Sequence, residues 1–173
     1  KNFYGATKIC AEALLRSYYY RYNLNYVGLR YFNVYGPRQD YKGAYIAVMM
    51  RMIDNIQKGI QPIIIGTGNE GFDFVSVRDC AEANVCALEA ETFNEFYNVG
   101  TGKKTTLKTL ALKILKLMNS NLKINYQKSK NVTLVKSRVG AITKAKKEIK
   151  YEYKINLDKG IKELIDWKKR LKN

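Results

Sequence analysis

Residues 2–31, NFYGATKICAEALLRSYYYRYNLNYVGLRY, decide the fold that we predict for this chain. Residues 2–22 contain no proline and no glycine after Gly5, and their apolar and aromatic side chains recur every three or four positions, which is typical of an amphipathic helix. Asn23–Asn25 interrupt that pattern, and residues 26–31 read as a mostly apolar strand of the kind buried in a parallel sheet. A helix followed by such a strand indicates the beginning of an α/β pattern.

The rest of the chain continues the alternation of helices and strands. Helices are predicted over residues 44–58 and over residues 79–90. A third helix follows a cap at Thr105 or Thr106 and has on one face Leu107, Leu110, Ala111, Ile114 and Leu117. A final helix is predicted around Leu157, Ile161, Leu164 and Ile165. Strands are predicted over residues 62–65, 73–77, 95–99 and 122–126, while residues 33–43 are loop-like and residues 127–142 have no clear pattern. This order predicts a mostly parallel sheet flanked by helices.

The composition limits the chemistry that this chain can perform. Its 173 residues, 46% hydrophobic and 27% charged, suit one soluble globular domain or part of one. No apolar run approaches the roughly 20 residues that cross a bilayer, so we expect no membrane segment. The sequence has no histidine, which excludes Ser-His and Cys-His nucleophile pairs and histidine metal ligands, and we predict no metal site. Catalysis must therefore use tyrosine, lysine, cysteine or carboxylates.

The cysteines and the first residues indicate where the protein works and how much of it is present. Cys10, Cys80 and Cys86 form no CxxC pair and lie in segments that we expect to be apolar and buried, which favours a reducing, cytoplasmic setting. The first residues, KNFYGATK, contain neither an initiator methionine nor an apolar signal core. We therefore expect the chain to be truncated.

The positive charge is concentrated in the second part of the chain. Residues 1–102 contain ten basic and ten acidic side chains, so residues 103–173 carry the whole net charge of +16. Such a basic segment could attract nucleic acid, an acidic membrane surface or phosphorylated small molecules. A lysine-rich solvated surface is an equally good interpretation.

Two glycine-rich stretches resemble nucleotide-binding loops without meeting their requirements. Residues 66–71 (GTGNEG) fit G-x-G-x-x-G, but a strand is predicted to follow them, whereas a dinucleotide loop must open a helix. We interpret them as a turn. Residues 99–106 (VGTGKKTT) precede a helix, but Tyr97 and Lys104 occupy positions where a Walker motif needs Gly and Ser or Thr.

Tyr4 and Lys8 form a candidate acid–base pair. At i and i+4 on a helix, the ammonium lies one turn from the phenol, where its charge can lower the tyrosine pKa from about 10 and let the phenolate act as a general base. Spacing alone is weak support, because Tyr126 and Lys130 have the same spacing. Taken alone, the spacing favours a packing role for Tyr4 over a role as a base.

Four segments in order extend this hypothesis: YGATK (4–8), LRYFNVYGPRQD (29–40), PIIIGTGNEGFDFVSVRDCAEA (62–83) and FYNVGTGKKTTLKTLA (96–111). Together they resemble the extended short-chain dehydrogenase/reductase family, specifically its NAD-dependent nucleotide-sugar epimerases and dehydratases of the UDP-glucose 4-epimerase type. The resemblance covers essentially the whole chain and matches the C-terminal half of such an enzyme. It implies an α/β fold: the C-terminal part of a Rossmann-like doubly wound parallel sheet plus a small α/β substrate-binding domain.

The resemblance also implies a domain division and a function. Residues 1–35 would hold the last helix and strand of the NAD-binding domain, whose N-terminal part is absent. Residues 36–173 would be mainly substrate-binding, with residues 73–100 returning to the Rossmann sheet. The implied reaction is NAD-dependent epimerisation of a nucleotide-diphosphate sugar through transient oxidation at C4, by a homodimer when full length. A 4,6-dehydratase or reductase of the same family, a basic nucleic-acid-binding module and an inactive fragment stay open as alternatives, with nucleic acid the less favoured partner.

By the same resemblance, Tyr4 would be the catalytic base, and Lys8 would lower its pKa and hold the cofactor ribose. Tyr31 and Phe32 would pack against the nicotinamide end of NAD, although both could instead be core residues at a strand end. The glycine-rich cofactor loop, the acidic residue for the adenosine ribose and the Ser/Thr partner of the catalytic tyrosine lie upstream in the family, before residue 1.

The implied substrate contacts come from several segments. Asn33 would hydrogen-bond the diphosphate, at a strand's carboxyl end where α/β sheets bind ligands. Ile63 and Ile65 belong to the short strand that lines the base pocket, although such residues are core in most proteins. Arg38 and Arg138 could pair with diphosphate oxygens through their forked guanidinium groups, or could be solvated surface residues.

One position departs from the family pattern. Phe72 precedes the Asp-Phe pair, where many members carry an arginine that grips the substrate diphosphate. Asp73 and Asp79 match acidic family positions that we interpret as structural, with Asp79 helping to cap the following helix. Gly100 and Gly102 mark a turn without assigned chemistry.

Overall fold

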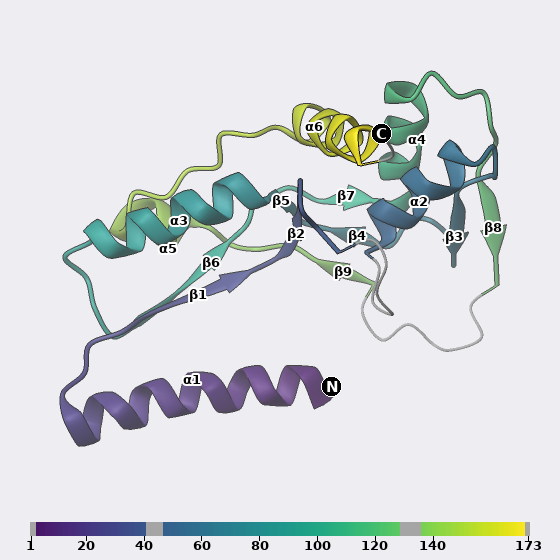
Figure 1. The fold of residues 1–173 in the computed structure, drawn as a ribbon. Helices are drawn as coiled ribbons and strands as arrows, with labels where there is room; N and C mark the ends of the chain where they lie inside the picture. Colours follow the sequence, from purple (N-terminus) through teal and green to yellow (C-terminus); the bar gives the residue numbers. More distant parts are fainter. Residues whose placement is uncertain (1–2, 41–46, 129–135, 172–173) are drawn as a thin grey trace.

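The fold was derived from a computed structural model, which describes residues 3–40, 47–128 and 136–171 (Figure 1). The helices are α1 (Phe3–Tyr22), α2 (Val48–Gln57), α3 (Val77–Glu89), α4 (Leu107–Leu117), α5 (Thr143–Glu148) and α6 (Leu157–Arg170). The strands are β1 (Val27–Tyr31), β2 (Asn33–Tyr35), β3 (Ile63–Ile65), β4 (Gly71–Phe72), β5 (Phe74–Ser76), β6 (Glu95–Val99), β7 (Thr105–Thr106), β8 (Asn125–Gln127) and β9 (Ser137–Arg138).

Parallel pairing dominates the strands, as the sequence predicts. β1 pairs with β6, β2 with β5, and β3 with β8, all in parallel. β4 lies between β7, its antiparallel neighbour, and β9, its parallel neighbour. The chain is therefore an α/β protein, and the predicted fold class is confirmed.

Two apolar clusters hold these elements together. The larger cluster joins α2, α4 and α6, which gather at one end of the molecule in Figure 1, and its fully buried side chains include Met50, Ile53, Leu110, Ile114, Ile161 and Leu164. The smaller cluster joins β5, β6, α3 and α5, and includes Val75, Ala83, Tyr97, Val99, Ala145 and Tyr151. Each cluster draws on segments far apart in the sequence, so the core is made by long-range packing.

Most predicted elements are present, with shifted ends. The strand at residues 95–99 and the final helix are confirmed, and Thr106 is the N-cap of α4, its hydroxyl accepting the amide of Thr109. The predicted loop at residues 33–43 was partly wrong, because residues 33–35 form β2 against β5. Of the helix predicted at residues 44–58, residues 48–57 are helical, and residues 44–46 lie outside the described part of the chain.

The first helix differs most from expectation. α1 forms as predicted, but it has no buried residue, and its apolar residues Ile9, Leu14 and Tyr18 are more than half exposed. Cys10, expected to be buried, is exposed on this helix, while Cys80 is buried and Cys86 half-buried. The 3.6-residue period predicted a helix with an apolar face, but it could not show whether another segment of this chain covers that face.

None of the helices among the described residues is long and apolar enough to cross a membrane.

Candidate functional site

Tyr4 and Lys8 line a cavity between α1 and the sheet. α1 runs antiparallel to β1, so its first turns lie near the carboxyl end of that strand (Figure 1). The cavity has a volume of about 530 Å³ and is bounded by α1, by residues 27–31 and by Phe96. Carboxyl ends of parallel strands are where α/β sheets bind ligands, and the volume lies in the range of ligand pockets, about 300–1,000 Å³.

The predicted base and its cation are together in the structure. The Lys8 Nζ lies 5.1 Å from the centroid of the Tyr4 ring, above its face. The first turn is closed by Thr7, whose hydroxyl donates a hydrogen bond of 2.8 Å to the Tyr4 carbonyl oxygen. The Tyr4 side chain is 69% exposed, so its hydroxyl is accessible to a substrate.

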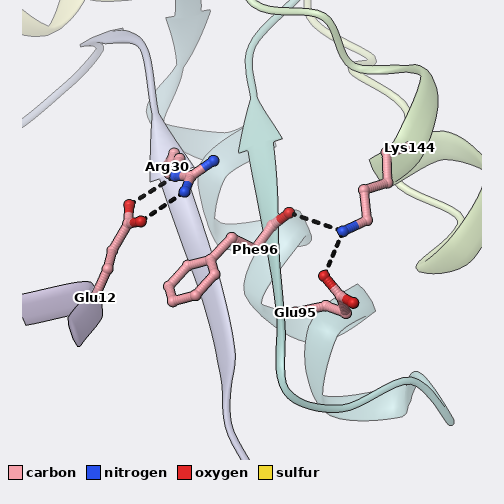
Figure 2. Close-up of polar contacts among 5 residues, drawn as sticks. All are labelled: Glu12, Arg30, Glu95, Phe96 and Lys144. Carbon is pink, nitrogen blue, oxygen red and sulfur yellow. Dashed lines mark hydrogen bonds and ion pairs between the residues drawn. The ribbon is translucent and has the colours of Figure 1, made fainter. Parts of the chain in front are cut away.

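An ion pair that the sequence did not reveal joins α1 to β1 (Figure 2). The Arg30 Nε donates to Glu12 Oε1 at 2.6 Å, and its Nη2 donates to Glu12 Oε2 at 2.5 Å. The Phe96 ring lies 5.0 Å from the guanidinium carbon of Arg30 and 5.0 Å from that of Arg16. The hydrogen bond from Arg30 lowers the pKa of Glu12. The signal in the sequence was the four-residue spacing of Tyr4, Lys8 and Glu12, but the partner strand was not predictable from it.

Tyr31 and Phe32 stand at the end of β1 and make different contacts. The Tyr31 hydroxyl donates to Asn84 Oδ1 on α3 at 3.0 Å, and burial raises the pKa of Tyr31. Tyr31 lines the cavity beside Tyr4 and a second cavity of about 490 Å³ against α3. The Phe32 ring packs over Gly140, where an added Cβ would lie 2.7 Å from the ring. Tyr31 is thus the one of the two that lines the cavity containing Tyr4 and Lys8.

Asp73 organises the segments that carry the predicted substrate residues. The Asn33 backbone amide and Nδ2 both donate to the Asp73 carbonyl oxygen, at 3.0 and 3.1 Å. The fully buried Asp73 carboxylate accepts the amides of Thr101, Gly102 and Gly140 and the Thr101 hydroxyl. This agrees with the structural role expected for Asp73.

Phe72 and Arg138 are neighbours on adjacent strands. They stand opposite each other in the parallel β4–β9 register, so their side chains are on the same face of the sheet. Asp73, next in the chain after Phe72, donates its amide to the Arg138 carbonyl oxygen at 3.0 Å. A cation from β9 therefore stands beside Phe72. Asn33 is linked to these two residues through Asp73, whose carbonyl oxygen accepts hydrogen bonds from Asn33 and whose amide donates to the Arg138 carbonyl oxygen.

The remaining predicted substrate residues line two other cavities. Ile63 and Ile65 in β3 line a cavity of about 610 Å³ with Val48 and Arg51 of α2. Arg38 lines a cavity of about 380 Å³ with Tyr35 of β2 and with neighbouring residues of the loop that follows. The structure thus groups Asn33, Phe72 and Arg138 around Asp73, and places Arg38 in a different cavity.

The two glycine-rich stretches are turns closed by carboxylates. Glu70 accepts the amides of Thr67 and Gly68 at 3.2 and 2.8 Å, and β4 follows directly, which confirms the predicted turn at residues 66–71. Hydrogen bonds from backbone amides, led by that of Glu70 itself, lower the pKa of the Glu70 carboxyl. In the second stretch, two amides are held by Asp73.

The predicted cap of the helix after Asp79 was wrong. α3 begins earlier, and its N-cap is Ser76, whose hydroxyl accepts the amide of Arg78 at 3.2 Å. Asp79 instead accepts the amides of Lys154 and Ile155, and burial raises its pKa. Asp79 therefore ties α3 to the segment before α6.

Comparison with protein families gives a match over more than half of the chain. The family described as "NAD dependent epimerase/dehydratase family" matches residues 1–100. A Methanocaldococcus jannaschii protein provisionally named a UDP-glucose 4-epimerase is 36% identical over 96% of this chain and 53% of its own length. The chain thus spans about half the length of this curated relative.

Solved structures agree with the sequence comparison. A Thermotoga maritima UDP-glucose 4-epimerase with UDP-glucose has a TM-score of 0.92 and 31% identity, covering 98% of this chain and 54% of its own. A Bacillus cereus UDP-glucuronic acid 4-epimerase with UDP-glucuronic acid and NAD has a TM-score of 0.87 and 28% identity, covering 97% of this chain and 52% of its own.

Proposed function

Because this chain belongs to the NAD-dependent epimerase/dehydratase family, we propose that it supplies the catalytic base and the substrate-binding part of a nucleotide-sugar 4-epimerase. The observation that carries this proposal is the pair of Tyr4 and Lys8 on one turn of α1, facing a cavity at the carboxyl end of β1. A general base beside a cavity of this size suits a small organic substrate.

The residues present fit the nicotinamide and ribose end of NAD. The cavity of about 530 Å³ lies between α1 and β1, and it offers the Lys8 ammonium as a donor and the Tyr4 hydroxyl as a donor or acceptor. Lys8 would hold the ribose, and Tyr31 would pack near the nicotinamide. NAD, when bound, supplies a reversible hydride acceptor for the sugar C4.

Tyr4 carries the proton in this mechanism. As a phenolate it removes the proton from the sugar O4–H while C4 loses its hydride, which leaves a 4-keto sugar. After the sugar has turned in the site, hydride returns to the opposite face of C4, and Tyr4 gives its proton back to O4. The net result is inversion at C4 with no consumption of protons or electrons.

Substrate binding is assigned to two places. Asn33 and Arg138, which lie around Asp73, would contact the diphosphate, and the cavity beside Ile63 and Ile65 would take the nucleotide base. A UDP-sugar is the substrate class that the relatives favour, since the Thermotoga maritima structure contains UDP-glucose. Phe72 carries no charge, and Arg138 stands opposite it on β9.

The domain division and the setting also remain proposals. Residues 1–35 and 73–100 would belong to the nucleotide-binding domain, which is supported by the parallel pairing of β1 with β6, and the rest would form the substrate-binding domain. We place the enzyme in the cytoplasm and expect it to form a homodimer through the exposed face of α1.

The test uses the product of the complete reading frame that contains this chain. Incubation with NAD and UDP-galactose should form UDP-glucose, and Tyr4→Phe should lower kcat by at least about 100-fold, the scale of general-base catalysis, while NAD stays bound. The change removes only the phenol oxygen, so the fold should persist.

Other outcomes redirect the assignment. A folded, NAD-binding protein that turns over no UDP-hexose would exclude the epimerase. Release of a 4-keto-6-deoxy sugar would then point to a dehydratase, and inertness toward every nucleotide sugar would point to an inactive relative.

A further inference from the structure

The contact between α1 and β1 extends the proposed function to two more residues. Resting on the role of Tyr4 given above, we propose that Glu12 and Arg30 are positioning residues that fix the rotation of α1 about its axis. They would thereby hold the Tyr4 hydroxyl and the Lys8 ammonium toward the reacting sugar and the cofactor ribose.

The three residues on α1 share one face of the helix. Tyr4, Lys8 and Glu12 are spaced by four residues, which places them in a row along one side over roughly 12 Å at 1.5 Å per residue. All three line the cavity of about 530 Å³, so this face looks toward β1. A contact that fixes Glu12 therefore fixes the direction in which Tyr4 and Lys8 point.

Arg30 is itself held in a defined position. Its guanidinium binds both carboxylate oxygens of Glu12 and lies over the ring of Phe96 (Figure 2). The Phe96 ring in turn covers Gly28, where an added Cβ would come within 2.2 Å of a ring carbon. A forked pair allows far fewer orientations than a single hydrogen bond, because two parallel contacts must be kept at once. The Glu12–Arg30 ion pair therefore anchors α1 to the paired strands β1 and β6.

Apolar packing does not replace this anchor within the described chain. α1 has no buried residue among the described segments, and the contacts that join it to the sheet include the Glu12–Arg30 pair and Arg16 over the ring of Phe96. A side chain at a helix surface lies about 6 Å from the axis, so a rotation of 20° moves its tip by about 2 Å. Since a misplacement of 1 Å can cost roughly 100-fold in rate, the rotation of α1 matters for a base at its surface.

The test compares the Glu12–Arg30 pair with the Glu95–Lys144 pair, which lie on opposite sides of Phe96 in Figure 2. In the complete reading frame, Glu12→Gln should lower kcat roughly 10- to 100-fold, with KM for the UDP-sugar within about threefold, because alignment is lost and binding is not. The matched control is Glu95→Gln, which removes the charge from the 2.6 Å pair with Lys144 and leaves the Glu12–Arg30 pair intact (Figure 2). Its kcat should stay within about twofold.

A charge exchange separates positioning from a general loss of stability. Glu12→Arg and Arg30→Glu should each lower kcat as single changes, and their combination should recover at least fivefold over the worse single variant. Recovery would be incomplete, because Arg30→Glu also removes the contact with Phe96. A combination no better than the worse single variant, or a Glu12→Gln enzyme with kcat within twofold of wild type, would overturn the proposal.

A second readout distinguishes failure of this inference from failure of the proposed function. Amide hydrogen exchange over residues 3–15 should become at least fivefold faster in Glu12→Gln and should not change in Glu95→Gln, whether or not any sugar is turned over. Unchanged exchange in Glu12→Gln would overturn the positioning role. Faster exchange together with a wild-type enzyme inert toward UDP-sugars would support the anchor and reject the epimerase.

Discussion

Three carboxylates accept hydrogen bonds from backbone amides, either of a tight turn or of loops far along the chain: Glu70, Asp73 and Asp79. Glu70 closes the turn at residues 66–70, Asp73 gathers amides from two later loops, and Asp79 accepts those of Lys154 and Ile155. The sequence identified the turn and the structural nature of both aspartates. It could not identify the partners of Asp79, because these stand 75 and 76 residues further along the chain.

The Glu70 turn gives a prediction with a defined pH dependence. Glu70→Gln should lower the free energy of unfolding by about 1 kcal/mol at pH 7, because the charged acceptor of two amides is lost. The pKa of Glu70 is lowered in the fold, so its contribution is present above the ordinary value of 4.5 and disappears as the pH falls through the folded value. Urea unfolding of both proteins between pH 7 and pH 3 measures this difference. A difference that is constant with pH would show that charge is not its cause.

Among the elements, the long helices and the strands β3, β5 and β6 were predictable, whereas β2, β4, β7 and β9 were not. Helices such as α4 and α6 carry their apolar period within one segment. β2, β4, β7 and β9 have two or three residues each and exist through partners elsewhere, such as Phe74 for Asn33. Strand formation depends on those neighbours more than on local preference.

The cap of α3 gives a prediction for one element. Ser76→Ala should lower the free energy of unfolding by about 1 kcal/mol, because the amide of Arg78 loses its acceptor. Thermal unfolding measures the effect, and Ser76→Thr, which keeps a hydroxyl acceptor, should retain most of the stability. Full stability in Ser76→Ala would show that another group accepts this amide.

For the whole molecule, the structure shows that lysines of the basic segment (residues 103–173) are paired with carboxylates. Among the described residues of the basic segment, five lysines form ion pairs with carboxylates on other elements or turns: Lys113, Lys144, Lys146, Lys154 and Lys168. The pair of Lys168 with Asp54 is largely buried and joins α6 to α2. The count of charges gave the net value but could not show these pairings, which fit a solvated surface better than a nucleic-acid face.

The exposed helix predicts how the 173-residue chain behaves in solution. Phe3, Ile9 and Leu14 on α1 are 93%, 71% and 59% exposed, so the chain should self-associate as its concentration is raised. Ile9→Lys together with Leu14→Lys should shift it toward the monomer in light scattering coupled to size-exclusion chromatography. Leu112→Lys, at a site 51% exposed on α4, is the control and should leave association unchanged. Equal association in both variants would mean that α1 is not the contact surface.

The hydrogen-bond partners of the buried Asp73 carboxylate are all synthesised after Asp73 itself. Its partners lie 28, 29 and 67 residues further along the chain, and Gly140 is the last of them. An unpartnered buried carboxylate is costly by several kcal/mol, so Asp73 stays hydrated until those loops arrive. On a nascent chain, the full set of hydrogen bonds to the Asp73 carboxylate can form only after residue 140 has left the ribosomal exit tunnel.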